Sequence, residues 1–270
     1  MNFFNYTLPA LYFGVSALVI TGCGGKAEQA EKPAPKTSAQ WADHSQRSHG
    51  LETWWGKQVV AMDMDVVFGG SPIVDGVFTF EAHGPKAKYE APEGLVVFDG
   101  KEAHVSVNPA DWPMARFHVL TWPWFLIAPV KMTGEGIELS DKKYIMLNGK
   151  EYLTFKQTFA AGVGDTPDDW YRYFIDPSTG RVEALSYIVT YGKDAEKAEE
   201  QPSIVFYKNY QSFDGVEFAT KYEFWYWDEK TGKLVGDAPK GEATVNSVTF
   251  LESADFAIPE GAQIQALPGS

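Results

Sequence analysis

Short segments of alternating polarity, separated by turn-forming dipeptides, constrain the fold of this chain more than any other feature. Every even-numbered position within residues 59–68 is apolar, which is the period of a β-strand with one face in a core. Asp99-Gly100 and Asn148-Gly149 each lie between two strand-like segments. Both dipeptides favour hairpin turns because they readily adopt positive φ. The sequence therefore predicts strands that pair with their neighbours along the chain.

Further strand-like segments continue toward the C-terminal end. They are residues 78–82, 96–98, 104–107, 144–147, 152–159, 171–175, 182–191, 218–227 and 243–251. About ten strands with short turns, and no helices alternating between them, predict one antiparallel sheet. Such a sheet must curl or close, because a long open edge would pair with other chains. We expect a fold that is mainly β.

Helical segments are expected at two polar or mixed stretches. Residues 41–56 predict one or two short helices, capped by Ser38 and broken at Gly50. Residues 193–201 are a run of charges without an apolar face, which is typical of a solvated loop or helical turn. Both segments would lie outside the sheet.

The most apolar stretch after the N-terminal region is residues 110–133. Because Pro113, Pro123 and Pro129 interrupt it, we expect short helices or turns here and not one continuous helix. This segment can be ordinary cover for a sheet face, or it can be a lid over an apolar groove. The two interpretations are compatible.

Residues 1–22 carry no charged side chain, and residues 8–22 have the character of the apolar core of an export signal. This core is short for a membrane-spanning helix. Residues 20–23 (Ile-Thr-Gly-Cys) resemble the lipobox of bacterial lipoproteins. The resemblance implies acylation of Cys23 and cleavage after Gly22. Since no Lys or Arg precedes the apolar run, an uncleaved anchor with an incidental cysteine is the alternative.

The rest of the chain divides into three expected parts. Residues 23–39 would be the lipidated cysteine and a flexible linker, residues 40–262 a single domain, and residues 263–270 a tail. Gly24 follows the cysteine, and its resemblance to the sorting rule of enterobacterial lipoproteins implies the outer membrane, facing the periplasm. Two or three acyl chains anchor a protein stably.

Charge and cysteine content exclude several classes of protein. The chain has 36 acidic and 23 basic residues and a net charge of −13, which argues against nucleic-acid binding. The net charge would also be repelled by anionic lipid surfaces, so the acyl chains would have to hold the protein at a membrane. One cysteine excludes internal disulfides and thiolate zinc clusters. We expect no cofactor.

Metal and phosphate motifs are weak in this sequence. Asp165, Asp168 and Asp169 could attract calcium, but their spacing does not match an EF-hand loop. We expect them to form a polar turn, and we assign no metal site.

Candidate acid–base residues are equally sparse. Asp63 and Asp65 share one strand face near Glu81 and His83 on the next strand, an arrangement that acid–base chemistry could use but that a solvated outer face also explains. We expect each histidine to donate to a backbone carbonyl, and His49 is the first that we would test. No catalytic residue is assigned.

Aromatic residues make up 15% of the chain and carry the best functional hint. Residues 222–228 place aromatic rings on both faces of one predicted strand. The candidate ligand-binding residues are Trp122, Trp124, Phe125, Ile127, Trp225, Trp227 and His49. A thick core with a few exposed rings is the alternative explanation.

Three stretches resemble a known bacterial family. They are His49-Gly50 with Trp54, residues 117–132, and the ending that runs from Asp214-Gly215-Val216 to Ala254-Asp255-Phe256 and Pro259. Together with the lipobox-like start, the layout is similar to the LolA/LolB-like lipoprotein-carrier superfamily and, more narrowly, to the uncharacterised DUF6503-type family. The resemblance covers about residues 40–260. It implies a curved antiparallel half-barrel whose concave face is aromatic and is covered by short helices.

The leading functional hypothesis is a membrane-anchored periplasmic lipoprotein. It would bind a lipid, an acyl chain or a lipoprotein tail in an aromatic groove, with residues 110–133 as the gate. One alternative is a structural or assembly lipoprotein that docks a protein partner through its aromatic surface. Another is an enzyme on the same scaffold.

Overall fold

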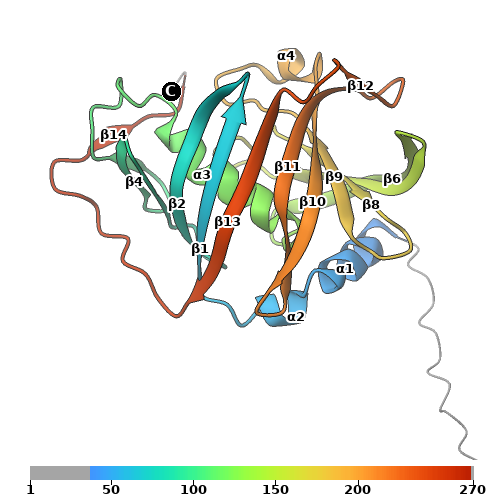
Figure 1. Cartoon of the computed structure of the whole chain (residues 1–270), viewed down its shortest axis with the longest axis horizontal. Coiled ribbons are helices and arrows are strands. Elements are labelled where there is room, and N and C mark those ends of the chain that lie inside the picture. The colour runs from blue at the N-terminus through green and yellow to red at the C-terminus, as the bar shows by residue number, and fades with distance from the viewer. Residues whose placement is uncertain (1–36, 269–270) are drawn as a thin grey trace, which may run out of the picture. The chain divides into compact units, whose positions relative to one another are not determined.

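A 14-stranded antiparallel sheet is the framework of the computed structural model, which describes residues 37–268 (Figure 1). The fold class expected from the alternating segments is confirmed, with more strands than the sequence predicted. The strands of this described part are β1 (Val59–Phe68), β2 (Ser71–Glu81), β3 (Ala87–Ala91), β4 (Gly94–Phe98), β5 (Ala103–Val105), β6 (Ile137–Leu147), β7 (Lys150–Phe159), β8 (Tyr171–Ile175), β9 (Val182–Tyr187), β10 (Ser203–Phe213), β11 (Val216–Asp228), β12 (Lys233–Val235), β13 (Gly241–Leu251) and β14 (Gln263–Gln265).

The strand order explains why a helix must cross the sheet. It is β14-β5-β4-β3-β2-β1-β13-β11-β10-β9-β8-β7-β6, with β12 beside β11. The chain runs outward from β1 to β5, then starts again at the opposite edge with β6 and returns inward to β11. Helix α3 (Ala115–Ile127) makes this connection and lies across one face of the sheet (Figure 1).

Both predicted hairpins form. Leu147 pairs with Lys150 across Asn148-Gly149, where φ is 51° and 81°, the positive values that this turn requires. At the other hairpin Phe98 pairs with Ala103, so the loop is longer than the dipeptide alone. Its Asp99 carboxylate accepts the backbone N–H groups of the two residues at 101 and 102.

The first helices are α1 (Ser38–Ser48) and α2 (Leu51–Trp54). The N-cap is Thr37 and not the expected Ser38. Thr37 Oγ1 accepts the N–H of Gln40, and the Gln40 side chain accepts the N–H of Thr37. A cap at Ser38 would put Trp41 at the third helical position, where it has no acceptor to return the bond.

Gly50 separates the two helices, as predicted, with φ of 89°. A Cβ atom at this position would lie 2.3 Å from the carbonyl oxygen of Gly215. We expect Gly50→Ala to lower the free energy of unfolding by about 2 kcal/mol or more. The added Cβ atom would be strained at this left-handed φ and would also clash with the Gly215 carbonyl oxygen. Urea denaturation measures this.

Gly56→Ala is the matched control for that substitution. Its added Cβ would be 3.5 Å from the nearest atom, and its φ is not in the left-handed region. If the two variants lose equal stability, the close approach at Gly50 is not the cause.

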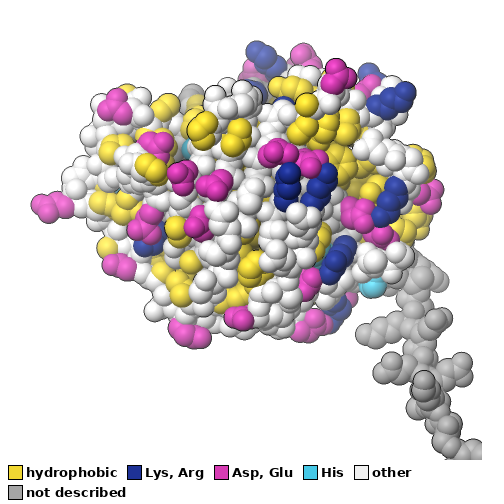
Figure 2. Space-filling view, in the orientation of Figure 1, with side chains coloured by type: hydrophobic (Ala, Val, Ile, Leu, Met, Phe, Trp, Pro, Cys, Tyr) yellow, Lys and Arg dark blue, Asp and Glu magenta, His cyan; other side chains and the backbone are white. Residues whose placement is uncertain are grey.

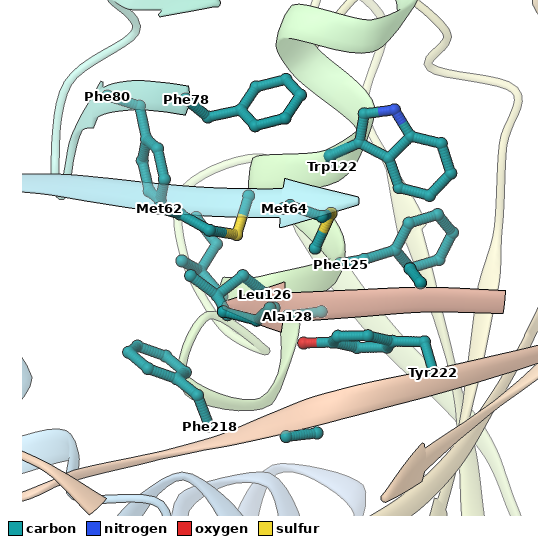
Figure 3. Packing of buried hydrophobic residues seen from close by; sticks show 14 of the residues in the cluster. Met62, Met64, Phe78, Phe80, Trp122, Phe125, Leu126, Ala128, Phe218 and Tyr222 are labelled. Carbon is teal, nitrogen blue, oxygen red and sulfur yellow. The ribbon is translucent and has the colours of Figure 1, made fainter. Parts of the chain in front are cut away.

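The main core lies between α3 and the facing side of the sheet. Met62 and Met64 of β1 and Phe78 and Phe80 of β2 point toward this side (Figure 3). Their spacing of two residues is the alternation seen in the sequence, and their odd-numbered neighbours face outward. Burial of each large apolar side chain contributes about 1.5–3 kcal/mol.

α3 is one continuous helix with Pro123 inside it, so the prediction that its prolines exclude such a helix is wrong at this position. A proline in a helix interior costs about 3 kcal/mol. The helix nevertheless buries Trp122, Phe125, Leu126 and Ile127, whose combined burial outweighs that cost. Pro113 precedes the helix, and Pro129 lies in the following 3₁₀ turn, η1 (Ala128–Val130).

A smaller cluster occupies the opposite face of the sheet. It comprises Leu147, Tyr152, Phe174, Ala184, Ile204 and Trp227, with Trp225 and Leu234 packed against it. The charge run at 193–201 contains a short helix, α4 (Ala195–Glu199). Its one buried residue, Ala198, packs with Trp170 and Ile188.

The C-terminal end of the chain differs from the expected layout. Residues 263–265, expected in a tail, form strand β14 beside β5, because Gln265 is buried there and bonded to the start of α3. The expected signal at 1–22, Cys23 and most of the linker lie outside the described residues. In residues 37–268 no helix is both long and apolar enough to cross a membrane.

Candidate functional site

Helix α3 is held at both ends by side chains from the sheet. At its start, the N–H of Arg116 donates to Oε1 of Gln265 at 2.6 Å. At its end, the Tyr207 hydroxyl donates to the carbonyl of Phe125 at 2.9 Å, and the Tyr173 hydroxyl donates to that of Ala128 at 3.2 Å. These backbone groups belong to helix termini, which lack partners within the helix. The helix is therefore fixed relative to the sheet.

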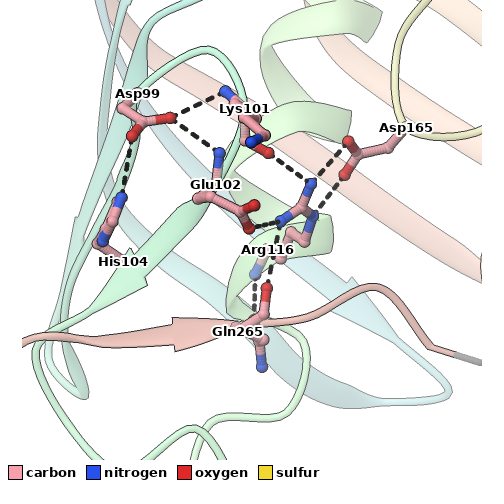
Figure 4. Close-up of polar contacts among 7 residues, drawn as sticks. All are labelled: Asp99, Lys101, Glu102, His104, Arg116, Asp165 and Gln265. Carbon is pink, nitrogen blue, oxygen red and sulfur yellow. Dashed lines mark hydrogen bonds and ion pairs between the residues drawn. The ribbon is translucent and has the colours of Figure 1, made fainter. Parts of the chain in front are cut away.

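Arg116 is the polar centre of this arrangement (Figure 4). Its guanidinium donates two bonds to the Asp165 carboxylate, at 2.7 and 2.9 Å, and further bonds to the carbonyls of Lys101 and Gln265. The Arg116 side chain is only 4% exposed. Its buried positive charge would be costly without these partners. The cluster joins α3, the β4–β5 loop, the β7–β8 loop and β14.

Two cavities adjoin α3. We name the larger one, of about 810 Å³, the Trp124 cavity. It lies among α3, the β4–β5 loop, the β7–β8 loop and residues 131–137. Its aromatic lining includes Trp124, whose ring centroid lies 5.4 Å from that of Tyr171 and 5.9 Å from that of Phe159. Cavities of about 300–1,000 Å³ with apolar walls are typical small-molecule sites.

The second, which we name the Trp122 cavity, has a volume of about 590 Å³. It extends toward β10, β11 and α4, and its aromatic lining includes Phe68, Trp122 and Phe224. The two cavities share a wall of Phe117, Thr121, Phe125, Tyr187, Val189 and Tyr191. A third hollow, of about 520 Å³, lies beside residues 252–257, away from α3, and its lining is largely charged and polar.

The structure brings three of the predicted ligand-binding residues to these cavities. Trp122 and Trp124 each line one cavity, and Phe125 lines both. Ile127 lines neither cavity and is buried in the main core. The insert at 110–133 thus supplies core cover and cavity wall at once.

Trp225 and Trp227 do not join this site, which corrects the prediction that grouped them with Trp122. Both pack on the opposite face of the sheet, where Trp227 is 2% exposed. Alternate residues of a strand point to opposite faces, and it is Phe224 of this strand that reaches the Trp122 cavity.

His49 is also separate from the cavities. It lies between α1 and the sheet, with no exposed surface. Its Nδ1 donates to the Ser45 carbonyl at 2.8 Å, and its Nε2 accepts the N–H of Val182 at 3.4 Å. The carbonyl bond is the expected one, and the residue holds α1 on the sheet.

Burial lowers the pKa of His49 to about 4 and does the same to the pKa of His118. In the unfolded chain each imidazole binds a proton below about pH 6.5. Between pH 6.5 and 4 the unfolded state therefore holds more protons, and folding stability falls as the pH falls. We expect a loss of about 3 kcal/mol for each histidine over this window.

Urea denaturation at a series of pH values tests this expectation. His49→Gln should reduce the pH slope, whatever its effect on stability at pH 7. A slope that His49→Gln does not change would contradict the assignment.

The candidate acid–base residues do not converge. Asp63 and Asp65 both accept from the Asn246 side chain on the outer face of the sheet. Glu81 pairs in register with Val59 and not with either of them, and the His83 ring stacks on Trp55. Among the possible calcium ligands, Asp165 binds Arg116 and Asp169 accepts from Thr166 and Thr190.

Sequence reasoning missed Arg116, Gln265 and Lys240, which sits at the Trp122 cavity. One signal was present: Arg116 is the only charged residue between Asp111 and Lys131, and a charge within so apolar a segment needs a buried partner. Nothing in the local sequence marks Gln265, since its bond to Arg116 spans 149 positions.

Comparisons with solved structures identify the fold. A LolA superfamily protein from Nitrosomonas europaea matches with a TM-score of 0.52 and 8% identity, over 84% of this chain and 99% of that one. A putative outer membrane lipoprotein-sorting protein domain from Vibrio parahaemolyticus matches with a TM-score of 0.47 and 11% identity, over 81% and 95%. The first of these two matches shows that this chain has a LolA-like fold.

Comparisons of the amino-acid sequence assign the chain to a family. No curated protein matches the chain. The model of a family of unknown function, DUF6503, matches residues 96–239, which include α3 and much of both cavities. Because this match spans more than half of the sequence, the chain belongs to the DUF6503 family.

Proposed function

We propose that this chain is a lipoprotein of the bacterial cell envelope that binds an apolar or amphipathic ligand in the Trp122 and Trp124 cavities. The ligand would be a lipid, an acyl chain or a lipoprotein tail. The observation that carries the proposal is the pair of adjoining aromatic-lined cavities on either side of the Phe117, Thr121 and Phe125 stripe of α3. The LolA-like fold is consistent with it.

The energetics of such binding come from removing apolar surface from water. Each buried methylene contributes about 0.8 kcal/mol, so about ten of them supply on the order of 8 kcal/mol before the cost of association is subtracted. Because Tyr207 and Tyr173 fix the end of α3, the walls are preformed and little binding energy is needed to order them.

Native mass spectrometry of residues 35–270, purified without detergent, tests the binding proposal. This segment is a compact unit that holds the sheet, both core clusters and both cavities. We expect a discrete added mass that organic extraction removes and that incubation with bacterial lipid extract restores. A protein that stays at its bare mass after that incubation would contradict the proposal.

Anchoring at the outer membrane, facing the periplasm, is the second part of the proposal and rests on the lipobox-like residues 20–23 and on Gly24. Labelling of cells with a radioactive fatty acid should mark the full chain. Cys23→Ser should remove both the label and the membrane association that depends on acylation. A labelled Cys23→Ser variant would place the acyl group elsewhere. Sucrose-gradient fractionation of the membranes then tests whether the protein is in the outer membrane, as we expect, or in the inner membrane.

One observation favours the alternative of a protein-docking lipoprotein. Tyr144 and Met146 of the edge strand β6 are 55% and 52% exposed, and Val235 of β12 is 46% exposed. Hydrophobic side chains gather on this side of the molecule (Figure 2). Site-specific cross-linking from position 146 in cells would capture a partner if this face docks one, and no cross-link would form if it does not.

A further inference from the structure

The rim of the Trp122 cavity has an excess of positive charge. Lys193, Lys197 and Lys240 line this cavity, together with a single carboxylate, Glu200. The charge of the lining is thus three minus one, or +2. The Trp124 cavity is lined by Lys101, Arg116 and Lys131 against Glu135, Asp165 and Asp169, which is three minus three, or zero.

This excess stands out because the chain as a whole carries −13. Several other lysines form ion pairs with carboxylates, as in Lys150–Glu183, Lys208–Glu223 and Lys221–Glu242. Within residues 37–268, none of the three lysines at the Trp122 cavity has a carboxylate within 4.0 Å. The neighbouring acids Asp194, Glu196 and Glu199 do not line the cavity.

Lys240 is the innermost of these cations. It is half-buried, its Nζ donates to the Ser203 hydroxyl, and the same atom lies 4.1 Å from the centroid of the Tyr226 ring. Burial lowers the pKa of Lys240 to about 8, and repulsion from Lys193 adds to this. A half-buried ammonium without an anionic partner is costly, and a ligand anion would relieve that cost.

We infer that the Trp122 cavity takes an amphiphile with an anionic headgroup, a carboxylate or a phosphate. The headgroup lies at Lys193, Lys197 and Lys240, and the apolar tail lies against Phe68, Trp122 and Phe224. This inference rests on the proposed function and adds the charge of the ligand and the end of the site at which the headgroup sits.

Binding of matched pairs of ligands to residues 35–270 tests the inference. Palmitic acid is compared with hexadecanol, and 1-palmitoyl lysophosphatidic acid with monopalmitoylglycerol, so that each pair differs in its anionic group. We expect about tenfold tighter binding of the anionic member in at least one pair, as one charge-assisted hydrogen bond supplies. The pair with the larger ratio distinguishes a carboxylate from a phosphate.

Lysine variants test whether the three lysines cause the preference for the anionic ligand. Lys240→Met and the double variant Lys193→Gln/Lys197→Gln should each bring the ratio closer to one, and Lys240→Arg should retain it. The double variant changes only exposed side chains, so it leaves the core undisturbed. Lys233→Gln, on β12 and outside the cavity lining, removes one positive charge, as Lys240→Met does, and should leave the ratio unchanged.

The possible failures are distinguishable. If the unaltered protein binds both members of each pair equally, the inference is wrong while the proposed function stands. A ratio that survives in Lys240→Met and in the double variant would likewise overturn it. Should no member of either pair bind, the proposed function falls and takes the inference with it.

Discussion

Thr121→Trp is expected to reduce binding of an apolar ligand at least tenfold while the protein stays folded. Thr121 lies one helical turn from Phe117 and one turn from Phe125, so the three form one stripe of α3. This stripe belongs to the wall that both cavities share. Thr121 is the smallest residue of the stripe, and an indole in its place would occupy space that a ligand tail needs.

Thr121→Val is the matched control, because it keeps the size of the side chain and should bind as the unaltered protein does. Both variants are compared by native mass spectrometry after incubation with bacterial lipid extract. Circular dichroism checks that they are folded. Full ligand uptake by a folded Thr121→Trp variant would mean that the ligand does not occupy this space.

Arg116→Met is expected to lower the free energy of unfolding by about 3–5 kcal/mol, because it leaves the Asp165 carboxylate without its partner. The Asp165 side chain is 15% exposed, so water replaces only part of the lost interaction. The substitution also removes the bonds to the carbonyls of Lys101 and Gln265. Urea denaturation gives the difference.

Arg181→Met supplies the comparison for that substitution. Arg181 also pairs with a carboxylate, that of Glu217 at 2.7 Å, but its side chain is 43% exposed, so we expect a loss below about 1 kcal/mol. The double variant Arg116→Met/Asp165→Asn should recover part of the loss, because it removes the unpaired charge. If Arg116→Met costs no more than Arg181→Met, the buried cluster does not stabilise the fold.

The candidate site was only partly predictable from residue patterns. The density of aromatic residues between prolines marked Trp122, Trp124 and Phe125, and these three do line the cavities. The same reasoning could not separate Trp225 and Trp227 from them, since a large apolar side chain is equally suited to either face of a sheet that is covered on both. His49 belonged to a family-like motif, and the structure places it between α1 and the sheet, bonded to Ser45 and Val182 and away from both cavities.

Local patterns in the sequence determined the elements of this protein. The period of two, the Asn148-Gly149 turn and the break at Gly50 each depend on a few adjacent residues, and the structure has all three. The order of the strands, the continuity of α3 through Pro123 and the gathering of Lys193, Lys197 and Lys240 at one rim were decided only by the tertiary structure. They depend on contacts between residues that are distant in the sequence, such as the bond from Arg116 to Gln265. The buried apolar surface that stabilises these features, against the entropy lost on ordering the chain, forms only once the sheet has assembled.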